Sequence, residues 1–387
     1  MRILFLAPQP FFEARGTPIN VRNMVTALSE LGHEVDLLVY PHGDNVDIPN
    51  VRIHRVIRIP GLGKAPIGPS KEKVIYDAAM MIHAFTTLVR GKYDAIHAVE
   101  DAAFMAWPLS WLFGVPFVFD MDSIMSDQLR YSRFMRDGFL LKAFERMESA
   151  ALRSASMVIT VCGHLTEAAA LRVDRSKIFQ IEDTPMTGAP PPGLAVEKLR
   201  AELGLPEGCE PVVYTGNLEK YQGIDLLLDS AVEVAREHPS VRIVVVGGSG
   251  ADVEKYKAKA GAMGLGANVV FAGPKPPETM PTYYELADIL VSPRIEGTNT
   301  PLKIYTYLDT GKPVVATDLP THTQALNRDV AMLARPEKME FARAILLLLN
   351  DKGLRRALGD RGREYVRSNF SYASFRKKLE EAYKHIR

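Results

Sequence analysis

The residues best suited to chemistry lie at positions 292–317, where a polar loop separates a buried strand from a short helix. An apolar run ends at Ser292, the loop carries Glu296, and Pro301 is expected to open the helix. Amides in the first turn of a helix lack partners within the helix and attract anions, and Lys303 adds a positive charge there. Glu296 is placed to accept hydrogen bonds from hydroxyl groups. This stretch predicts a site for an anionic, hydroxyl-rich ligand.

A second polar loop, residues 214–223, follows another predicted strand and leads into a helix. Four of its residues are candidates to contact the same ligand, namely Gly216, Asn217, Lys220 and Gln222. Lys220 would supply a cation to a diphosphate. Taken alone, however, the loop would be interpreted as polar surface.

The turn after the first predicted strand contains Gly16 and Thr17, followed by Pro18. Glycine allows a tight turn and close approach of a ligand, Thr17 suits an N-cap, and Pro18 suits the first helical turn. The start of that helix would favour a phosphate. The alternative is that Gly16 only makes the turn. The sequence GxxxxGK[ST] does not occur, so this turn is not a P-loop.

A glycine-rich turn at residues 247–250 follows the predicted strand 243–246. It resembles a dinucleotide fingerprint, but the G-x-G-x-x-G spacing is incomplete and no acidic residue is suitably placed after the next strand. We interpret it as a strand end near a ligand, and Gly273 ends the following strand in the same way. The incomplete pattern argues against a nicotinamide-dependent dehydrogenase.

The elements that must position these loops alternate between strands and helices. Continuous apolar runs, as at residues 3–7 and 35–40, are typical of buried parallel strands, and helical periodicity follows them. The alternation lapses at residues 186–193, a linker rich in proline and glycine, and then restarts. The sequence therefore predicts an α/β protein of two doubly wound domains, residues 1–185 and 194–369, with ligands at the carboxyl ends of the strands.

Bulk properties exclude several classes of protein. The 387 residues suffice for two domains, and the formal net charge of +1 supplies no field that would recruit nucleic acid. Cys162 and Cys209 match no metal or redox spacing, which favours a reducing compartment. The opening apolar run is too short for a secretory signal, and no apolar run reaches the ~18 residues of a membrane span. We expect a cytoplasmic protein that binds no nucleic acid.

These residues in this order resemble the retaining GT-B glycosyltransferases of family 4. The likeness covers nearly the whole chain and is most specific at Leu302-Lys303 and at Gly311-Lys-Pro-Val-Val-Ala-Thr317. It implies two Rossmann-like domains facing a central cleft, with a nucleotide-sugar bound by the second domain. It also implies that the final helix crosses back, which places residues 370–387 with the first domain. Such enzymes typically need no metal ion, and we expect no cofactor.

The chain departs from the family pattern at three places. Thr306 replaces the second glutamate of the family motif, which would hold the donor ribose, and Glu296 lies ten residues before it. Asn217 and Gln222 stand where an Arg and a Lys usually neutralise the diphosphate, and Val99 stands where a histidine often lies. Losing a charge-assisted hydrogen bond, worth roughly 1.5–3 kcal/mol, would weaken donor binding about tenfold to a hundredfold. Reduced activity, an unusual donor and a substitution at Thr306 are all compatible with this pattern.

The resemblance implies transfer of a sugar from a nucleotide-diphosphate sugar to a hydroxyl group with retention of configuration. The acceptor would attack from the face that the diphosphate leaves, and the phosphate would take its proton. Glu296 and Glu100 are the candidate catalytic residues, and Asp101 and Asp122 are acceptor-side candidates, although caps or satisfied polar residues explain them equally well. The predicted donor contacts are Gly16, Thr17, Gly216, Asn217, Lys220, Gln222, Gly273, Gly297, Thr300, Pro301, Leu302, Lys303 and Thr306.

The acceptor is compatible with a glycan, a lipid or a small molecule. Residues 130–153 combine six basic side chains with apolar ones, which suits contact with a membrane surface and a lipid-linked acceptor. A solvated face over a packed core explains the segment equally well. Peripheral contact with the inner membrane face is therefore an alternative to a purely cytoplasmic location.

Two other classes of function fit the same scaffold. A non-catalytic or weakened protein that binds sugar-nucleotides or glycans is favoured by Thr306. A nucleotide-sugar epimerase would use a similar pair of domains. Measurable donor hydrolysis or transfer would exclude the first alternative, and interconversion of free nucleotide-sugars without an acceptor would reveal the second.

Overall fold

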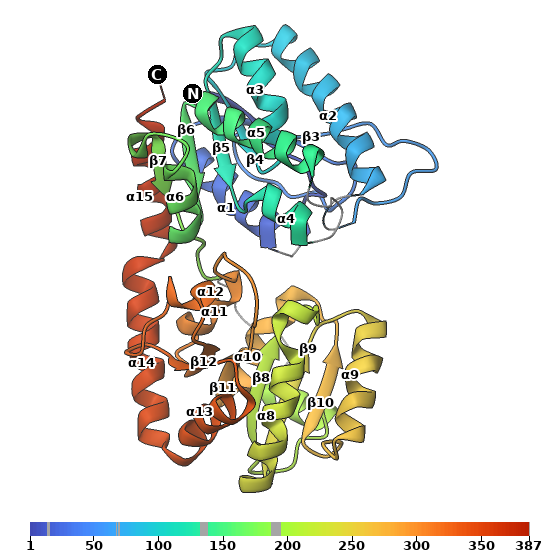
Figure 1. The fold of residues 1–387 in the computed structure, drawn as a ribbon, viewed down its shortest axis with the longest axis vertical. Helices are drawn as coiled ribbons and strands as arrows, with labels where there is room; N and C mark the ends of the chain where they lie inside the picture. The colour runs from blue at the N-terminus through green and yellow to red at the C-terminus, as the bar shows by residue number, and fades with distance from the viewer. Residues whose placement is uncertain (14–15, 67, 69, 132–137, 187–194, 387) are drawn as a thin grey trace. The chain divides into compact units, whose positions relative to one another are not determined.

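The computed structural model describes residues 1–13, 16–66, 68, 70–131, 138–186 and 195–386. These residues form two compact units, each with a parallel sheet between helices (Figure 1). Unit 1 comprises Met1–Glu182 and Phe375–Arg387, and unit 2 comprises Asp183–Ser374. The predicted α/β class with two Rossmann-like halves is confirmed. The predicted linker, residues 186–193, lies outside the described residues except for Met186.

Unit 1 is built on a seven-stranded parallel sheet in the order β3-β2-β1-β4-β5-β6-β7. Its central strands are continuous apolar runs because helices cover both faces of the sheet. The order reverses between β1 and β4, and a ligand site is expected beyond the carboxyl ends of strands at such a switch point. The strands are β1 Arg2–Ala7, β2 Glu34–Val39, β3 Val51–Arg55, β4 Ala95–Val99, β5 Phe117–Met121, β6 Met157–Thr160 and β7 Ile178–Gln180.

One face of this sheet is covered by α2, α3, α5 and α6, whose inner side chains form one core with the strands. The opposite face carries α15, since His97 of β4 points there while its neighbours Ile96 and Ala98 point into that core. The helices are α1 Gly16–Glu30, α2 Lys71–Arg90, α3 Ala102–Phe113, α4 Met125–Tyr131, α5 Phe139–Ser154, α6 Gly163–Ala170, a 3-10 turn Arg175–Lys177 and α15 Tyr372–Tyr383.

The C-terminal helix α15 packs on unit 1, as the resemblance implies. The hydroxyl of Tyr383 lies 2.7 Å from Nδ1 of His97, and the ring of Phe5 stacks on His97 at 4.1 Å between centres. Phe375 and Leu379, which needed a packing partner, are buried, and Lys378 forms an ion pair with Glu182. Buried apolar and polar contacts therefore join a helix at the end of the chain to the first sheet.

Unit 2 repeats the arrangement with six parallel strands in the order β10-β9-β8-β11-β12-β13. Its switch point lies between β8 and β11. The strands are β8 Glu210–Thr215, β9 Val241–Val246, β10 Val269–Gly273, β11 Ile289–Ser292, β12 Val314–Thr317 and β13 Met332–Ala334. The helices are α7 Val196–Glu202, α8 Ile224–Glu237, α9 Gly250–Ala262, α10 Met280–Leu286, α11 Leu302–Asp309, α12 Pro320–Thr323, α13 Lys338–Asn350 and α14 Lys352–Asn369, with 3-10 turns Lys220–Gln222 and Pro277–Thr279.

The local differences from the sequence predictions have simple causes. Helix α1 begins at Gly16, so Thr17 lies inside the first turn. The prediction that Thr17 is the N-cap is therefore wrong. Pro18 is tolerated there because the first amides of a helix have no acceptor within it. Strands β7 and β13 have no counterpart in the prediction, because three residues at the edge of a sheet carry too short an apolar pattern.

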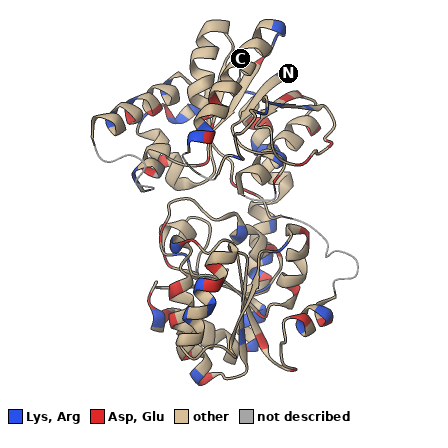
Figure 2. Ribbon diagram, turned by 90° about the vertical axis from the view of Figure 1, so that its right-hand side faces the viewer, with Lys and Arg blue, Asp and Glu red and all other residues tan. Residues whose placement is uncertain are grey.

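Charged side chains of both signs are spread over the helices of both units (Figure 2). This mixture agrees with the formal net charge of +1. Within the described parts of the chain, no helix combines the length and the apolar character needed to cross a membrane. Cys162 and Cys209 are buried free thiols.

Candidate functional site

In unit 2, the start of α11 carries a lysine held among uncharged side chains. The ammonium of Lys303 lies 4.2 Å from the centre of the Tyr214 ring and donates to Oε1 of Gln222 at 3.2 Å. Burial and the neighbouring charge of Arg294 lower the pKa of Lys303 to about 7. Tyr214 lies in β8, and Gln222 lies in the 3-10 turn that follows this strand. The structure therefore brings together two polar segments that are far apart in the sequence.

A second cation, Arg294, lies directly after β11. Its guanidinium lies over the ring of Tyr221, 5.0 Å from the centre, and donates to the backbone oxygens of Glu296 at 2.8 Å and Asn299 at 3.4 Å. Burial lowers its pKa. Among the described residues, neither Arg294 nor Lys303 forms an ion pair with a carboxylate. Two half-buried cations without a counter-ion disfavour each other, and a bound anion would relieve this repulsion.

Thr300 adds an unsatisfied hydroxyl at the same place. Its Oγ1 is buried and has no hydrogen-bond partner among the described residues. Pro301 occupies the N-cap position of α11, so the unpaired amides of Leu302 and Lys303 follow at once. Buried hydroxyls nearly always have a partner, and an absent one indicates a missing ligand or water. Cations, hydroxyl and helix amides together provide the chemistry of a phosphate site.

Two glycines provide the space in which the side chains of Lys303 and Arg294 lie. A Cβ on Gly216, which has φ 143°, would lie 2.8 Å from Nζ of Lys303. A Cβ on Gly297, with φ 121°, would lie 2.5 Å from Nη2 of Arg294. Both predicted donor contacts therefore have a steric reason within the protein, which is to keep the cationic groups in place.

A buried polar network lies beneath the loop after β11. His322 places Nε2 2.9 Å from the hydroxyl of Ser292 and Nδ1 2.9 Å from that of Thr317. Thr317 also donates to the backbone oxygen of Arg294 at 2.5 Å. Burial lowers the pKa of His322 to about 3, so its ring is neutral at ordinary pH. The network holds the backbone of Arg294, and the sequence analysis did not anticipate it.

Thr306 forms a hydrogen bond within the protein. Its side chain is buried, and its Oγ1 accepts a hydrogen bond of 3.0 Å from the backbone amide of Met186. Met186 is the first residue of the predicted linker. The residue that stands in place of the expected glutamate thus secures the chain segment leading into unit 2.

Three other predicted residues have exposed side chains. Lys220 points to solvent, and Asn217 donates to the hydroxyl of Tyr221 at 3.2 Å. The side chain of Glu296 is exposed, and its backbone oxygen is the group that binds Arg294. Gly273 ends β10, and its carbonyl accepts from the amide of Gly247 at 2.8 Å. Arg294 was not among the predicted site residues, yet it, and not the exposed Lys220, is the second cation near Lys303. Its position two residues after the end of β11 could have identified it from the sequence.

The glycine-rich turn after β9 supports the neighbouring loop. A Cβ on Gly247 would lie 2.1 Å from the backbone oxygen of Gly216, and one on Gly248 would lie 2.5 Å from Leu218. The following Ser249 caps α9 by accepting from the amide of Asp252 at 3.3 Å. Packing under the 214–223 loop therefore explains these glycines without a dinucleotide.

In unit 1, Glu100 directly follows β4 and has a strained conformation. Its φ is 49°, which is uncommon for a residue other than glycine and costs on the order of 1–3 kcal/mol. The hydroxyl of Ser123 donates to its Oε1 at 2.9 Å. Burial and the charge of Asp101 raise the pKa of Glu100. Strain of this kind persists where surrounding structure enforces it, and it is concentrated at functional sites.

A group of polar side chains surrounds Glu100 at this edge of the sheet. Lys73 of α2 contacts Asp101 at 2.5 Å and Asp77 at 3.8 Å, and the hydroxyl of Tyr40 donates to Asp77 at 2.5 Å. Burial, opposed by the attraction of Lys73, raises the pKa of Asp77 to about 6. Asp101 was a predicted site residue, but Lys73 and Asp77 were not, because they lie on α2, far from Asp101 in the sequence.

Asp122 and Gly16 complete the predicted residues of unit 1. Asp122 accepts a hydrogen bond of 3.2 Å from Asn20 of α1. A Cβ on Gly16 would meet no atom within 4 Å, and the residue does not adopt a left-handed φ. Neither packing nor backbone conformation in the described residues requires a glycine there. Arg15, which precedes it, lies outside the described residues.

Comparison with known families divides the chain at the same place as the fold. The family described as Glycosyl transferase 4-like domain matches residues 15–182. The family described as Glycosyl transferases group 1 matches residues 195–365. The first match lies in unit 1 and the second in unit 2.

Individual proteins are similar to this chain over almost its full length. The D-inositol 3-phosphate glycosyltransferase of Corynebacterium aurimucosum is 25% identical, and the alignment covers 96% of this chain and 91% of that protein. Sucrose-phosphate synthase from Thermosynechococcus elongatus has the same fold, with a TM-score of 0.79, 22% identity and coverage of 99% and 98%. Anabaena HepE in complex with UDP-glucose gives a TM-score of 0.74 at 18% identity, covering 99% of both chains.

Proposed function

We propose that this chain transfers a sugar with retention of configuration. It would do so as a GT-B glycosyltransferase, with a glycosyl transferase 4-like domain followed by a glycosyl transferases group 1 domain. The donor would be a nucleotide-diphosphate sugar bound by unit 2, and the acceptor would be a hydroxyl group. The observation that carries this proposal is the set of unpaired groups at the start of α11. Lys303, Arg294 and the hydroxyl of Thr300 are arranged for an anion that no described side chain provides.

The reaction follows from the needs of the leaving group. The bond between the anomeric carbon and the diphosphate oxygen breaks, the acceptor oxygen bonds to the same face of that carbon, and the acceptor proton moves to the leaving diphosphate. Negative charge grows on the diphosphate, and Lys303, Arg294 and the α11 amides would stabilise it. Glu296, on the loop between β11 and α11, would orient the hydroxyls of the sugar. These cations supply the charge that a metal ion supplies elsewhere, so we propose turnover without a metal.

The strained carboxylate of unit 1 is the proposed acceptor contact. Glu100 would accept a hydrogen bond from the reacting hydroxyl. It lies at the carboxyl end of β4, and the hydroxyl of Ser123 holds its carboxylate in place by donating to Oε1. Asp101 and Asp122 would bind further hydroxyls of the acceptor or hold the loops that do so. Gly16, where a side chain would meet open space, would let the donor approach the start of α1.

We also propose that unit 1 contacts a membrane through an apolar surface on α2, α3 and α5. Ten of the sixteen large apolar side chains that are exposed among the described residues lie on these three helices. The helices cover the same face of the sheet, and ring contacts join α2 to α3 and α3 to α5. The apolar surface comprises Val74, Ile75, Ile82, Phe85, Val89, Trp111, Leu112, Phe139, Leu140 and Met147.

Charge favours a lipid surface over a protein partner. Arg90 ends α2, and Lys142, Arg146 and Arg153 are exposed on α5, the helix that also carries Phe139, Leu140 and Met147. A face that combines aromatic and aliphatic side chains with lysine and arginine suits the interface of an anionic bilayer. The enzyme would then act at the cytoplasmic side of a membrane, where a lipid-linked acceptor would be within reach. Residues 132–137, which belong to the basic and apolar segment predicted from the sequence, lie outside the described residues.

The donor proposal is tested by binding of UDP and UDP-glucose to the full chain, followed by thermal shift and calorimetry. Because only the folded protein binds the donor, a true donor raises the melting temperature. We expect Lys303→Gln to weaken binding about tenfold to a hundredfold, since it removes a charge-assisted contact. Lys257→Gln, which removes an exposed charge on α9, should leave binding within twofold. Equal binding by both variants would contradict the assignment of Lys303.

Turnover of Glu296→Ala with a donor that binds tests the catalytic roles in unit 2. We expect slower transfer with little change in nucleotide affinity, because Glu296 is proposed to contact the sugar and not the diphosphate. The activity should persist in excess EDTA. Undiminished turnover of the variant would remove Glu296 from the mechanism, and loss of activity in EDTA would remove the metal-independent reaction.

A further inference from the structure

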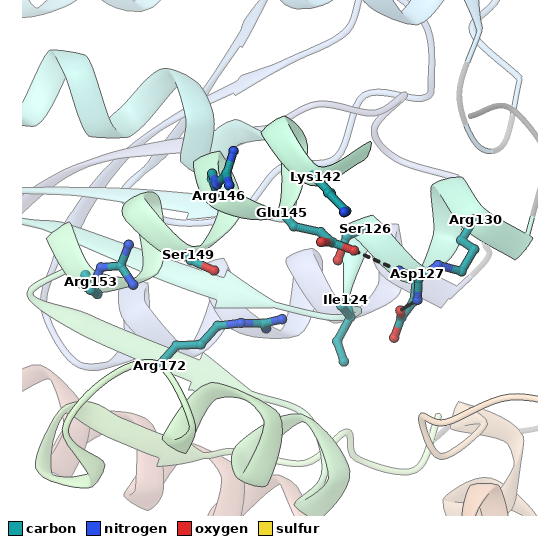
Figure 3. Close-up of a pocket in the computed structure, with 10 residues that line it drawn as sticks. All are labelled: Ile124, Ser126, Asp127, Arg130, Lys142, Glu145, Arg146, Ser149, Arg153 and Arg172. Carbon is teal, nitrogen blue, oxygen red and sulfur yellow. Dashed lines mark hydrogen bonds and ion pairs between the residues drawn. The ribbon is translucent and has the colours of Figure 1, made fainter. Parts of the chain in front are cut away.

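A basic groove of about 700 Å³ lies on unit 1, between α4, α5 and the segment that follows α6 (Figure 3). We define it by its five cationic side chains, Arg130, Lys142, Arg146, Arg153 and Arg172. Three of them lie on one stripe of α5 at helical spacing, and Arg172 enters from the segment after α6. The groove is thus formed by side chains from three separate parts of the chain.

The positive charges of this groove are mostly unbalanced. Its two carboxylates, Asp127 and Glu145, both contact Arg130, at 3.3 Å and 2.8 Å. Within the described part of the chain, the other four cations form no ion pair. Nη1 of Arg172 is buried and lacks a hydrogen-bond partner there. Leaving a charged donor buried and unsatisfied is costly, so this arrangement favours an anionic ligand.

The groove is attached to the segment that contacts Glu100. Ile124 and Ser126 line it, and Ser123, the residue before them, donates to Glu100. Glu148 of α5 accepts from the amide of Met125 at 2.9 Å and from the hydroxyl of Ser126 at 2.7 Å. These buried bonds fasten α4 to α5. An anion in the groove would therefore be held in a fixed relation to the carboxyl end of β5.

We propose that the basic groove binds a phosphate group carried by the acceptor, an inference that rests on the proposed transferase function. Arginine presents paired N–H groups that match phosphate oxygens, and three or four cations around one hollow suit a phosphomonoester or phosphodiester. The hydroxyl to be glycosylated would belong to the same molecule and lie toward Glu100. The phosphate belongs either to a soluble phosphorylated compound or to a lipid headgroup, and the experiment below separates these sources.

The test uses the full chain with Lys303→Gln, so that binding of the probe at the proposed donor site is weakened. Glycerol 3-phosphate is titrated by calorimetry, with glycerol as the uncharged comparison. We expect Arg153→Gln/Arg172→Gln to weaken binding of glycerol 3-phosphate at least tenfold. The matched control, Lys257→Gln/Arg356→Gln, removes two exposed charges from unit 2 and should change binding less than twofold. If Arg172 proves necessary for folding, Lys142→Gln/Arg146→Gln replaces the first pair, since both side chains are exposed.

Vesicles identify the source of the phosphate. The same variants are sedimented with phosphatidylcholine vesicles that do or do not contain phosphatidic acid as a minor lipid. If the groove variants lose binding of glycerol 3-phosphate, the proposal is supported and the phosphate belongs to a soluble compound. If they lose binding only to vesicles that contain phosphatidic acid, the proposal is supported and the phosphate belongs to a lipid headgroup. Equal behaviour of the groove pair and the control pair with both probes would overturn it. Binding of UDP to the unmodified chain is measured in parallel, so failure of the donor proposal is seen separately.

Discussion

At the scale of the residue, the informative feature of this protein is charge without a partner. Lys303 and Arg294 are half-buried, yet the described residues offer them only carbonyl, amide and ring contacts. Burying a cation in this way is unfavourable in the free protein. The cost is recovered when an anion binds, which ties the affinity for a diphosphate to the protonation state of Lys303.

The affinity of unit 2 for a nucleotide-sugar should therefore fall as the pH rises above about 7. With its pKa lowered to about 7, Lys303 is already protonated below this pH, and binding there needs no proton. Above it the free lysine is neutral and must take up a proton on binding, so the dissociation constant should rise by up to about tenfold per pH unit. Calorimetry with UDP-glucose between pH 6 and pH 9, in buffers of different ionisation enthalpy, measures both the affinity and the proton uptake.

Lys303→Gln is the control for this pH dependence. It should bind more weakly at pH 6 and show a nearly flat profile, because the titrating group is gone. UDP-glucose is preferred over UDP as the probe because it lacks a terminal phosphate that titrates near pH 6. A profile with the same slope in both proteins would show that another group controls the binding.

At the scale of the element, α15 shows how a terminal helix becomes part of a distant sheet. His97 lies inside β4, with Asp120 of β5 3.1 Å from its Nε2 and Tyr383 at its Nδ1. The three groups form a buried polar chain from the sheet to the helix. Such a network is specific because an unpaired member is expensive.

Tyr383→Phe should destabilise unit 1 by about 1–3 kcal/mol, because it leaves a buried nitrogen of His97 without a partner. Urea unfolding followed by tryptophan fluorescence measures this change. The two tryptophans of the chain, Trp107 and Trp111, both lie on α3 of unit 1, so the signal reports this unit. Lys384→Gln, next to Tyr383, removes an exposed ion pair and should change stability by less than about 0.5 kcal/mol. Equal effects of the two substitutions would show that the buried bond contributes little.

At the scale of the whole molecule, the uneven distribution of exposed apolar side chains is the main feature. Most surfaces expose single apolar residues, but here ten gather on α2, α3 and α5 of unit 1. Trp111, 84% exposed, is the largest of them. A side chain of this size in water has no benefit to folding, so its position favours a surface that binds something apolar.

Trp111 should report binding to anionic vesicles directly. In the variant Trp107→Phe, the remaining fluorescence comes from Trp111 and should shift to shorter wavelength on addition of vesicles that contain phosphatidic acid, because the indole leaves water. Ile82→Ser should weaken vesicle binding about tenfold, since a buried aliphatic side chain contributes about 1.5–3 kcal/mol. Leu347→Ser, an exposed leucine of unit 2, should have no effect on vesicle binding. An unchanged spectrum would contradict membrane contact by this surface.

The sequence by itself determined the architecture and the location of the loop that we propose to bind the donor. Parallel strands buried on both faces must be apolar throughout, so β1, β2 and β11 are visible without any tertiary information. The start of α11 is equally local, because the loop before it, the N-cap position and Lys303 are neighbours in the chain. These signals depend only on residues within one element, which is why composition and spacing suffice for them.

Only the tertiary structure decided which of these residues act together. Lys303 meets Tyr214 and Gln222 because the region at the end of β8 and the start of α11 converge, and the amide of Met186 donates to the hydroxyl of Thr306 across 120 residues. The strained backbone of Glu100 and the side chains that surround it come from β4, β5 and α2. Such pairings depend on loop conformation and on contacts between distant segments, and neither leaves a periodic pattern in the sequence.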